Sequence, residues 1–462
     1  MKKNFFLKKF LYAAIVLVLI GAAAGMSGSN QVAVNSEISS SPGSAAEILN
    51  GTPVSSESPE FSSAEPGSSS VGSISSAGVS SGVSRVPGQS QSNGTGSIAA
   101  ASPSASPPFQ HSSKMVLGYY GGWAAYSGFS PDKISASSLD VLNYAFAKID
   151  TNLKVTAADS SIDYSNFTKL KNLKRTYSKL KTIISIGGWS DSGRFSDAAL
   201  TETSRTAFAD SAVSFMKKNG FDGIDIDWEY PTGGGLSSNV TRSADPANFR
   251  LLLKTLRSKL DSQGARDNRH YILSFAGGTS SSYAKKIGLS TVAQYVDYGM
   301  IMTYDFHGSW EAYTDFNAPL YPCAGQSPLE KSSVDAAVQS WLNHGFPAGK
   351  LIMGVPFYGY VYQGTGSANN GLWQSFSSAS PVGYDTVQSK YLSKSSFRRY
   401  RDSSAQVPWL FDGSTFVSFE DTVSIQKKVQ YSASKKLLGV GVWDLGFDKT
   451  GTLIKSVKQT LK

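Results

Sequence analysis

The sequence is poor in the residues that usually build disulfide scaffolds and metal sites. Of 462 residues only Cys323 is a cysteine, so no intramolecular disulfide can form and a hydrophobic core has to supply stability. The four histidines are widely separated and show no metal-ligand spacing: His111, His270, His307 and His344. We therefore expect neither a metal nor another cofactor.

Signs of nucleic-acid binding are also lacking. The formal net charge is +9, of which residues 1–26 carry +4 and residues 27–113 carry −4, so the rest carries +9. No basic stripe or nucleic-acid-binding motif accompanies this charge, which fits a solvated surface. We expect no nucleic-acid partner, and we expect a monomer.

The first 26 residues have the pattern of a targeting segment. A basic start, "MKKNFFLKKF", is followed by an apolar run of 17 residues, 10–26, that ends in small residues. This pattern predicts a secretory signal peptide cleaved near Ala24. An uncleaved membrane signal-anchor is the alternative, because the length of the apolar run is close to the about 18 residues that begin to suggest a membrane-spanning helix. Both place the rest of the chain outside the cytoplasm, secreted or tethered to the outer membrane surface.

Residues 27–113 are dominated by serine. This stretch contains 29 serines, many Gly and Pro, and almost no aromatic residues. Such a composition cannot bury enough apolar surface to offset the conformational entropy of folding. We predict a disordered linker. Because this linker follows the apolar segment 10–26, it favours the alternative in which that segment tethers the protein to the membrane.

From residue 114 short apolar runs alternate with helical patterns at 203–219, 245–262 and 332–344. Continuous Val, Ile and Leu runs are typical of parallel strands covered on both faces. Eight such units predict an α/β fold, the (β/α)8 TIM barrel, over 114–462, with an active site at the carboxyl ends of the strands. The strand candidates are 115–120, 139–149, 182–189, 221–230, 271–278, 298–306, 350–359 and 437–446.

The interval between the seventh and eighth strand candidates is too long for an ordinary loop. Residues 360–436 are rich in Tyr, Ser, Phe and Trp. We interpret them as a small α+β insertion that forms one wall of a cleft. The alternative is an irregular surface excursion.

Four carboxylates crowd into the fourth strand candidate, "FDGIDIDWEY". Side chains alternate faces along a strand, so Asp225, Asp227 and Glu229 point to one face, the barrel interior, with Glu229 nearest the mouth. Asp222 has the opposite parity and is expected to support packing or a hydrogen-bond network.

Three neighbouring carboxyl groups inside a barrel cannot all stay ionised without cost. Burial and mutual repulsion raise at least one pKa, which provides an acid that is still protonated near neutral pH. A metal site and a structural hydrogen-bond network are the alternatives. Metal sites usually recruit ligands from several strands, so acid catalysis is the favoured hypothesis.

These residues also resemble a known family. "DGIDIDWEYP" (222–231) is similar to the D-x-x-D-x-D-x-E signature of glycoside hydrolase family 18 chitinases. Further matches follow in the family's order, and the long interval before the last strand resembles the subfamily with an α+β insertion. They are "SIGGW" (185–189), "MTYDFHGSWE" (302–311), "NAPLY" (317–321), "GVPFYG" (354–359) and "GVGVWDLGFD" (439–448).

The resemblance implies hydrolysis of β-1,4 links of chitin or chitooligosaccharides with retention, by attack of the substrate's own acetamido oxygen and through an oxazolinium intermediate. It implies that Glu229 is the general acid and base. Asp227 would orient the acetamido N–H, Asp225 would share a proton with Asp227, and Tyr304 would bond the acetamido oxygen.

The resemblance also suggests substrate-binding residues, because aromatic faces suit the apolar faces of sugars. They are Trp443, Asp305, Trp189, Trp310, Tyr119, Tyr358 and Met302. Trp123, Trp373 and Trp409 either extend the cleft or pack internally. Trp341, inside a helical pattern, is expected in the core.

One position departs from the family pattern. Many relatives have Arg directly after the seventh-strand "YG", whereas this chain has Tyr360, so the contact of that arginine is in question. Two other functions remain open. One is endo-β-N-acetylglucosaminidase activity on N-glycans or on peptidoglycan, and the other is a non-catalytic, lectin-like chitin-binding protein.

Overall fold

The computed structural model describes residues 114–325, 327–329 and 332–461. The expected signal segment (1–26) and linker (27–113) lie outside these residues. None of the helices in the described ranges has the length and apolar character needed to cross a membrane.

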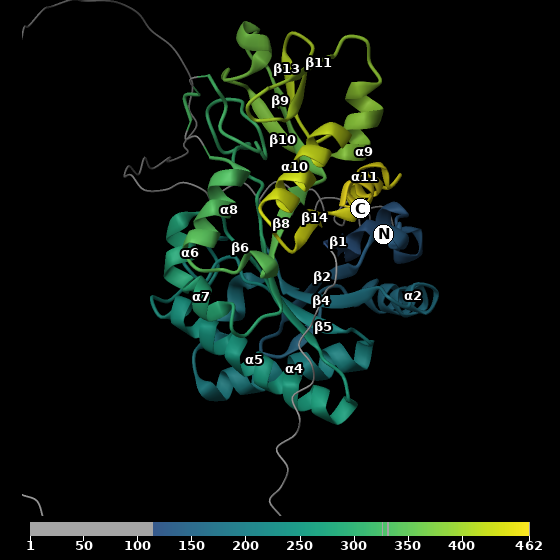
Figure 1. The fold of residues 1–462 in the computed structure, drawn as a ribbon, viewed down its shortest axis with the longest axis vertical. Coiled ribbons are helices and arrows are strands. Elements are labelled where there is room, and N and C mark those ends of the chain that lie inside the picture. The colour runs from purple at the N-terminus through teal and green to yellow at the C-terminus, as the bar shows by residue number, and fades with distance from the viewer. Residues whose placement is uncertain (1–113, 326, 330–331, 462) are drawn as a thin grey trace, which may run out of the picture. The chain divides into compact units, whose positions relative to one another are not determined.

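Eight parallel strands close into a barrel, which confirms the predicted fold class (Figure 1). They follow one another in chain order, and β1 closes the barrel by pairing with both β2 and β14. A short strand, β3 (Val155–Ala157), pairs antiparallel with β2. The barrel strands are β1 (Met115–Gly121), β2 (Val141–Ile149), β4 (Lys181–Gly187), β5 (Gly223–Asp227), β6 (Ile272–Gly277), β7 (Tyr298–Ile301), β8 (Leu351–Pro356) and β14 (Gly439–Trp443).

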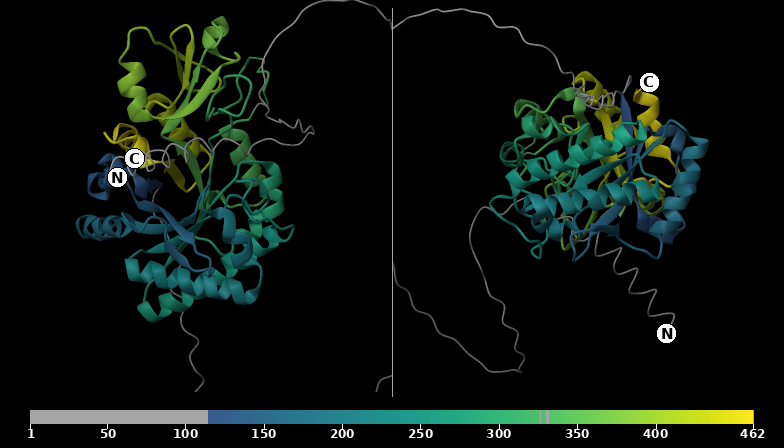
Figure 2. Two further views of the ribbon diagram at one scale, coloured as in Figure 1. Left: turned by 180° about the vertical axis from the view of Figure 1, so that it is seen from behind. Right: turned by 90° about the horizontal axis from the view of Figure 1, so that it is seen from below.

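Helices cover the outside of the barrel (Figure 2), and local sequence signals set their ends. In α4 the Thr201 side chain accepts from the backbone of Ser204 and the Ser204 side chain bonds back, while Gly220 ends the helix with φ of 78°. The helices are α2 (Asp163–Thr176), α3 (Phe195–Ala199), α4 (Glu202–Asn219), α5 (Asp245–Asp267), α6 (Ser281–Ile287), α7 (Leu289–Val292), α8 (Val334–Asn343), α9 (Tyr384–Thr386), α10 (Thr422–Ser434) and α11 (Thr452–Leu461).

Side-chain alternation separates the core into an inner and an outer layer. On β1, Met115, Leu117 and Tyr119 join a cluster inside the barrel, whereas Val116 and Tyr120 pack toward the helices. The strands are therefore apolar on both faces, which explains their continuous apolar runs.

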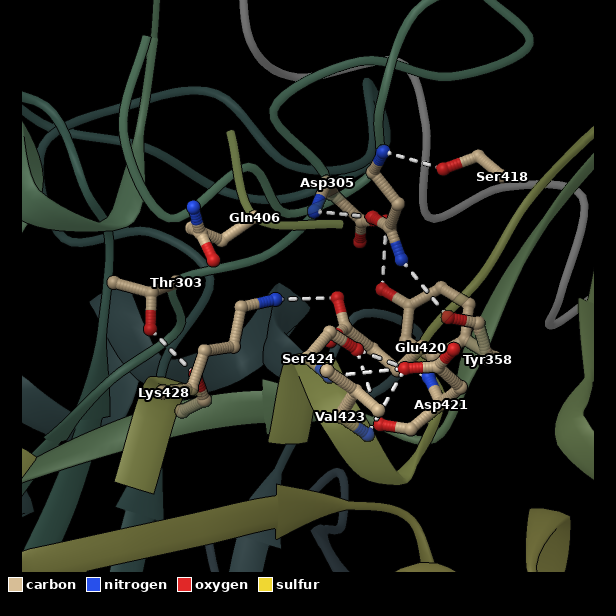
Figure 3. Close-up of polar contacts among 12 residues, drawn as sticks. Thr303, Asp305, Tyr358, Gln406, Ser418, Glu420, Asp421, Val423, Ser424 and Lys428 are labelled. Carbon is tan, nitrogen blue, oxygen red and sulfur yellow. Dashed lines mark hydrogen bonds and ion pairs between the residues drawn. The ribbon is translucent and has the colours of Figure 1, made fainter. Parts of the chain in front are cut away.

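A second, antiparallel sheet follows β8 and stands at one end of the barrel (Figure 1; Figure 2, left). The next helix, α10, lies within the expected insertion range 360–436 but packs on α11 and β14 as a barrel helix does. A buried ion pair between Lys428 of α10 and Glu420 joins the end of the sheet to this helix (Figure 3). The strands of the insertion are β9 (Tyr358–Gln363), β10 (Ser378–Gly383), β11 (Arg398–Arg401), β12 (Pro408–Phe411) and β13 (Thr415–Ser418).

Candidate active site

The carboxylates of β5 point into the barrel. Asp225 bonds to residues of neighbouring strands, while Ile224 and Ile226 belong to the outer hydrophobic layer, as the parity predicts. The strand ends at Asp227, so Glu229 lies two residues beyond its carboxyl end rather than within it. A barrel strand that ends here presents its last acids at the catalytic face.

Asp225 sits at the centre of a hydroxyl cage. Its Oδ2 accepts from Tyr119 Oη at 2.8 Å and from Ser185 Oγ at 2.7 Å, and its Oδ1 accepts from Ser274 Oγ at 2.7 Å. Burial raises the pKa of Asp225, and the hydrogen bonds from these hydroxyls oppose that rise. Donors from β1, β4 and β6 therefore favour an ionised Asp225 despite its depth.

Asp227 has the opposite surroundings. It is buried, and within the described residues its Oδ1 finds no hydrogen-bond partner. Burial, and then the negative charges of Glu229 and Asp225, raise the pKa of Asp227 well above its usual value. Of these two carboxyl groups, Asp227 is therefore the one whose protonated form the surroundings favour more.

Hydrogen bonds hold the backbone of Glu229, whereas no lysine or arginine of the described residues pairs with its carboxyl group. Its N–H donates to Ser192 Oγ at 2.9 Å, and its C=O accepts from Asn239 Nδ2 at 3.2 Å. Only 9% of Glu229 is exposed. Burial raises its pKa to about 7, the charge of Asp305 adds to the rise, and a hydrogen bond from Tyr230 opposes it. Such a group is partly protonated at neutral pH, as a general acid has to be.

Asp222 lies outside this group, as its parity predicts. Its carboxylate forms ion pairs with Lys174 at 2.5 Å and Arg269 at 2.6 Å, and accepts from the Thr182 backbone N–H at 2.8 Å. The pKa of Asp222 is lowered, because these partners outweigh its burial. Asp222 thus supports the base of the strand.

Tyr304 and Asp305 follow β7 and face the same site. Burial and the charges of Asp227 and Glu229 raise the pKa of Tyr304, which places its hydroxyl in their field. Asp305 Oδ1 accepts from Tyr358 Oη at 2.6 Å (Figure 3). It also accepts from Tyr360 Oη at 2.7 Å. The structure therefore brings Tyr304, Asp305 and Tyr358 to the β5 carboxylates, and adds Tyr360.

Trp443, the last residue of β14, belongs to an aromatic group at the barrel mouth. Its ring stacks on Phe146 with centroids 5.7 Å apart, and also contacts Tyr119 at 5.6 Å and Trp123 at 6.3 Å. It remains only partly buried. This arrangement presents an aromatic face at the mouth of the barrel, the end at which β5 presents its carboxylates.

The other expected substrate residues differ in how much surface they offer. Trp189 is only 5% exposed and Tyr119 is fully enclosed, so Tyr119 acts through its bond to Asp225. Trp310 and Met302 are partly buried, and the Trp310 ring meets Tyr360 edge-on at 5.7 Å.

The remaining tryptophans divide between the insertion and the core. Trp373 Nε1 donates to Asp315 at 3.1 Å, and Trp409 stacks on Tyr400 at 5.2 Å, so both are tied to their own surroundings. Trp341 is completely buried, as expected of a core residue.

Several site residues carried too weak a signal to be singled out in the sequence. Ser185 and Ser274 are single serines in apolar strands, and only the closed barrel reveals that both donate to Asp225. Asn317, within the "NAPLY" segment, bonds the backbone N–H of Asp305 at 2.8 Å. Phe146 lies inside β2, and nothing in the sequence of that strand indicated its stacking on Trp443.

The acids and aromatic residues of the site indicate which kind of ligand it can bind. Among the described residues, no cluster of three or more His, Cys, Asp or Glu side chains is arranged to hold a metal ion. The site instead combines an acid that is partly protonated at neutral pH, a neighbouring carboxyl with a raised pKa and an unpartnered oxygen, and aromatic faces. That combination suits acid-assisted cleavage of a neutral ligand with apolar faces, such as a sugar chain.

Comparison with known proteins gives one consistent result. The family model "Glycosyl hydrolases family 18" matches residues 115–448. Chitinase A1 of Niallia circulans is 37% identical over 410 residues, a region that covers 76% of this chain and 58% of that protein. The chain therefore spans well under two thirds of the length of this relative.

Solved structures agree with the family match. Chitinase ChiA74 from Bacillus thuringiensis superposes with a TM-score of 0.71 at 32% identity, covering 76% of this chain and 70% of the other. A family 18 N-acetylglucosaminidase from Paenibacillus barengoltzii gives 0.69 at 34% identity, covering 75% and 99%. With the carboxylates of β5 in place, the chain belongs to glycosyl hydrolase family 18.

Proposed function

We propose that the protein is a chitinase, which hydrolyses β-1,4 links between N-acetylglucosamine units of chitin or chitooligosaccharides. The observation that carries this proposal is Glu229, a buried carboxyl at the mouth of the barrel whose pKa is raised to about 7. The similarity to proteins named chitinases supports the substrate class.

In the proposed first step, Glu229 donates its proton to the glycosidic oxygen as the bond to the anomeric carbon breaks. The substrate's own acetamido oxygen attacks that carbon, so an oxazolinium forms and no protein nucleophile is needed. Asp227, in its protonated form, accepts the acetamido N–H on the carboxyl oxygen that does not carry its proton. Its lack of other donors supports this role, because an unpartnered carboxyl oxygen is available to the substrate.

In the second step Glu229, now ionised, removes a proton from water. The water oxygen attacks the anomeric carbon from the face that the leaving group occupied, and the oxazolinium opens to the acetamide. The product keeps the β configuration. Tyr304 donates to the acetamido oxygen in both steps, and Trp443 supports the sugar ring; the partly buried positions of both residues support these roles.

The test is a product time course on chitohexaose with analysis of the anomers. We expect cleavage with the β-anomer formed first, which reports retention and the position of cleavage together. Release of the α-anomer first contradicts the mechanism. An absence of new reducing ends contradicts catalysis and favours the lectin-like alternative.

A second candidate function follows from the likeness to the Paenibacillus barengoltzii protein, which is named an N-acetylglucosaminidase. Release of single sugars from one end of chitohexaose is the outcome that favours it. Parallel incubations with a high-mannose glycopeptide and with bacterial cell wall test the remaining endo-β-N-acetylglucosaminidase alternative.

The proposed substrate lies outside the cell, and we propose that the protein does too, either secreted or tethered through residues 10–26. The apolar run and the serine-rich spacer in the sequence support this location. Mass spectrometry of the mature amino terminus decides between the two forms. A start near residue 25 excludes the tether.

A further inference from the structure

Asp305 is held by one of its two carboxylate oxygens. Tyr358 and Tyr360, both on β9, donate to the same atom, Oδ1, at 2.6 and 2.7 Å. Within the described residues no donor bonds to Oδ2, and Asp305 is only partly buried. The two phenols therefore fix the carboxylate plane and leave Oδ2 to the site.

The backbone of Asp305 is fixed as well. Its φ of +56° lies in the left-handed region, which a residue with a side chain adopts only when its surroundings hold it there. Asn317 Oδ1 accepts the Asp305 N–H at 2.8 Å, while the Asn317 backbone N–H donates to Ser418 Oγ and its Nδ2 donates to the Tyr358 carbonyl. Side chain and backbone are thus both anchored to strands of the insertion.

Tyr360 is well suited to hold its hydroxyl in one direction. Only 1% of it is exposed. Its ring meets Trp310 at 5.7 Å, Tyr358 at 6.1 Å and Tyr362 at 6.3 Å. A ring packed on three sides cannot turn away, so its bond to Asp305 costs little entropy.

The groups that face Asp305 are acidic or neutral. Glu229 approaches from the end of β5, together with its neighbour Tyr230, and Tyr304 from the end of β7. The tyrosines of β9 supply the remaining neighbours, Tyr362 among them. Within the part of the chain that the structure describes, no lysine or arginine forms an ion pair with Asp305.

We propose that Tyr360 is a positioning residue: with Tyr358 it anchors Asp305 Oδ1 and presents Oδ2 to the substrate, without bringing a positive charge into the site. The identity of the substrate rests on the proposed function, whereas the anchoring does not. An arginine at this position would hold Asp305 ionised, but a phenol leaves it able to titrate. Burial raises the pKa of Asp305 to about 6, and the bonds from Tyr358 and Tyr360 oppose the rise.

The sign of the effect follows from the bonds. A donated hydrogen bond favours the ionised carboxylate, so removing the Tyr360 hydroxyl raises the pKa of Asp305. Replacing Tyr360 by arginine lowers that pKa, because a cation favours the ionised form more strongly.

The test titrates Asp305 directly by 13C NMR of aspartate side-chain carboxyls, with the signal assigned through Asp305→Asn. Tyr360→Phe should move the midpoint upward by about one pH unit, the size expected for one lost bond to a charged group. Tyr360→Arg should move it downward. Tyr362→Phe is the matched control, because the Tyr362 hydroxyl is buried on the same strand and finds no hydrogen-bond partner among the described residues.

A midpoint in Tyr360→Phe that matches Tyr362→Phe overturns the proposal, as does an unchanged midpoint in Tyr360→Arg. Kinetics on chitohexaose then report on the substrate. Tyr360→Phe should lower kcat/KM at pH 7 about fivefold, mostly through KM, and Tyr362→Phe should stay within about twofold. The NMR titration needs no turnover, so a failure of the wild-type protein to cleave chitohexaose refutes the proposed function and leaves the anchoring tested.

Discussion

The two ends of β5 hold carboxylates in opposite electrostatic surroundings. At its base, Asp222 lies between Lys174 and Arg269 and has a lowered pKa. At its mouth, Asp227 and Glu229 have raised pKa values, and no lysine or arginine in the described residues pairs with either. The two ends are separated by only a few residues of one chain segment.

The difference shows that burial alone does not assign a role to an acid. Asp222 and Asp227 are both buried, at 4% exposure each. Cations compensate the first and favour its ionised form, whereas the charges of Glu229 and Asp225 beside the second favour its protonated form. One dense acidic stretch therefore combines a structural ion-pair site with an acid–base site, and the two ends of β5 can be tested separately.

The largest effect is expected at the mouth of the strand. Glu229→Gln removes the proton donor but keeps the shape and the backbone bonds to Ser192 and Asn239. We expect kcat on chitohexaose to fall about a thousandfold, within the range of general acid–base catalysis. Calorimetric binding of the oligosaccharide should be retained, and substantial residual hydrolysis would show that another group is the acid.

The pH dependence of kcat/KM tests the raised pKa itself. The acid has to be protonated, and the pKa of Glu229 is about 7, so kcat/KM should fall tenfold per pH unit only above about pH 7. Because Asp227 is a close neighbour, the limb reports an apparent value of both groups together. A substrate with a nitrophenol leaving group needs less acid assistance and should show a shallower limb. If the fall in kcat/KM is instead centred below pH 6, the pKa of the acid is not raised by burial as we infer for Glu229.

The sequence predicted the barrel and its acids because these depend on local patterns. Apolar runs marked the eight strands, and parity alone put Asp225 and Asp227 inside and Asp222 outside. The end of the strand before Glu229 could not be predicted, because the alternating pattern continues past the last paired residue.

Contacts between segments that lie far apart in the chain could not be predicted from the sequence. Ser274 lies 49 positions from Asp225, and Tyr360 lies 55 positions from Asp305. Their hydroxyls meet these carboxylates only because barrel closure and the insertion sheet bring separate strands together. Tyr360 attracted notice as a departure from a family pattern, but its partner emerged only in three dimensions.

A smaller effect is expected from a change in the three hydroxyl groups that donate to Asp225. Asp227 Oδ1 has no such donors among the described residues. Ser274→Ala removes one of three donors and makes Asp225 a better competitor for the proton on Asp227. An ionised Asp227 makes Glu229 a weaker acid, so we expect kcat to fall about tenfold, since one hydrogen bond to a charged group is worth about 1.5 kcal/mol. Ser262→Ala on the exposed face of α5 is the control and should leave kcat unchanged. Equal kcat in the two variants would show that the cage does not tune the pair.

The smallest effect on catalysis is expected at the base of the strand. Asp222→Asn leaves Lys174 and Arg269 without their carboxylate, and their side chains are 23% and 41% exposed, so water can replace part of the interaction. We expect a loss of about 2 kcal/mol in the free energy of unfolding at pH 7, below the value for a fully buried pair, with kcat within twofold of wild type.

This loss should depend on pH in a defined direction. Since folding lowers the pKa of Asp222, its stabilisation is complete above the unfolded value of about 4 and disappears as the pH falls through the folded value. Urea denaturation of wild type and Asp222→Asn should therefore differ most at neutral pH and converge below about pH 4. A difference that persists unchanged at low pH would point to lost packing instead of lost ion pairs, and a large fall in kcat would mean that the two ends of β5 do not act independently.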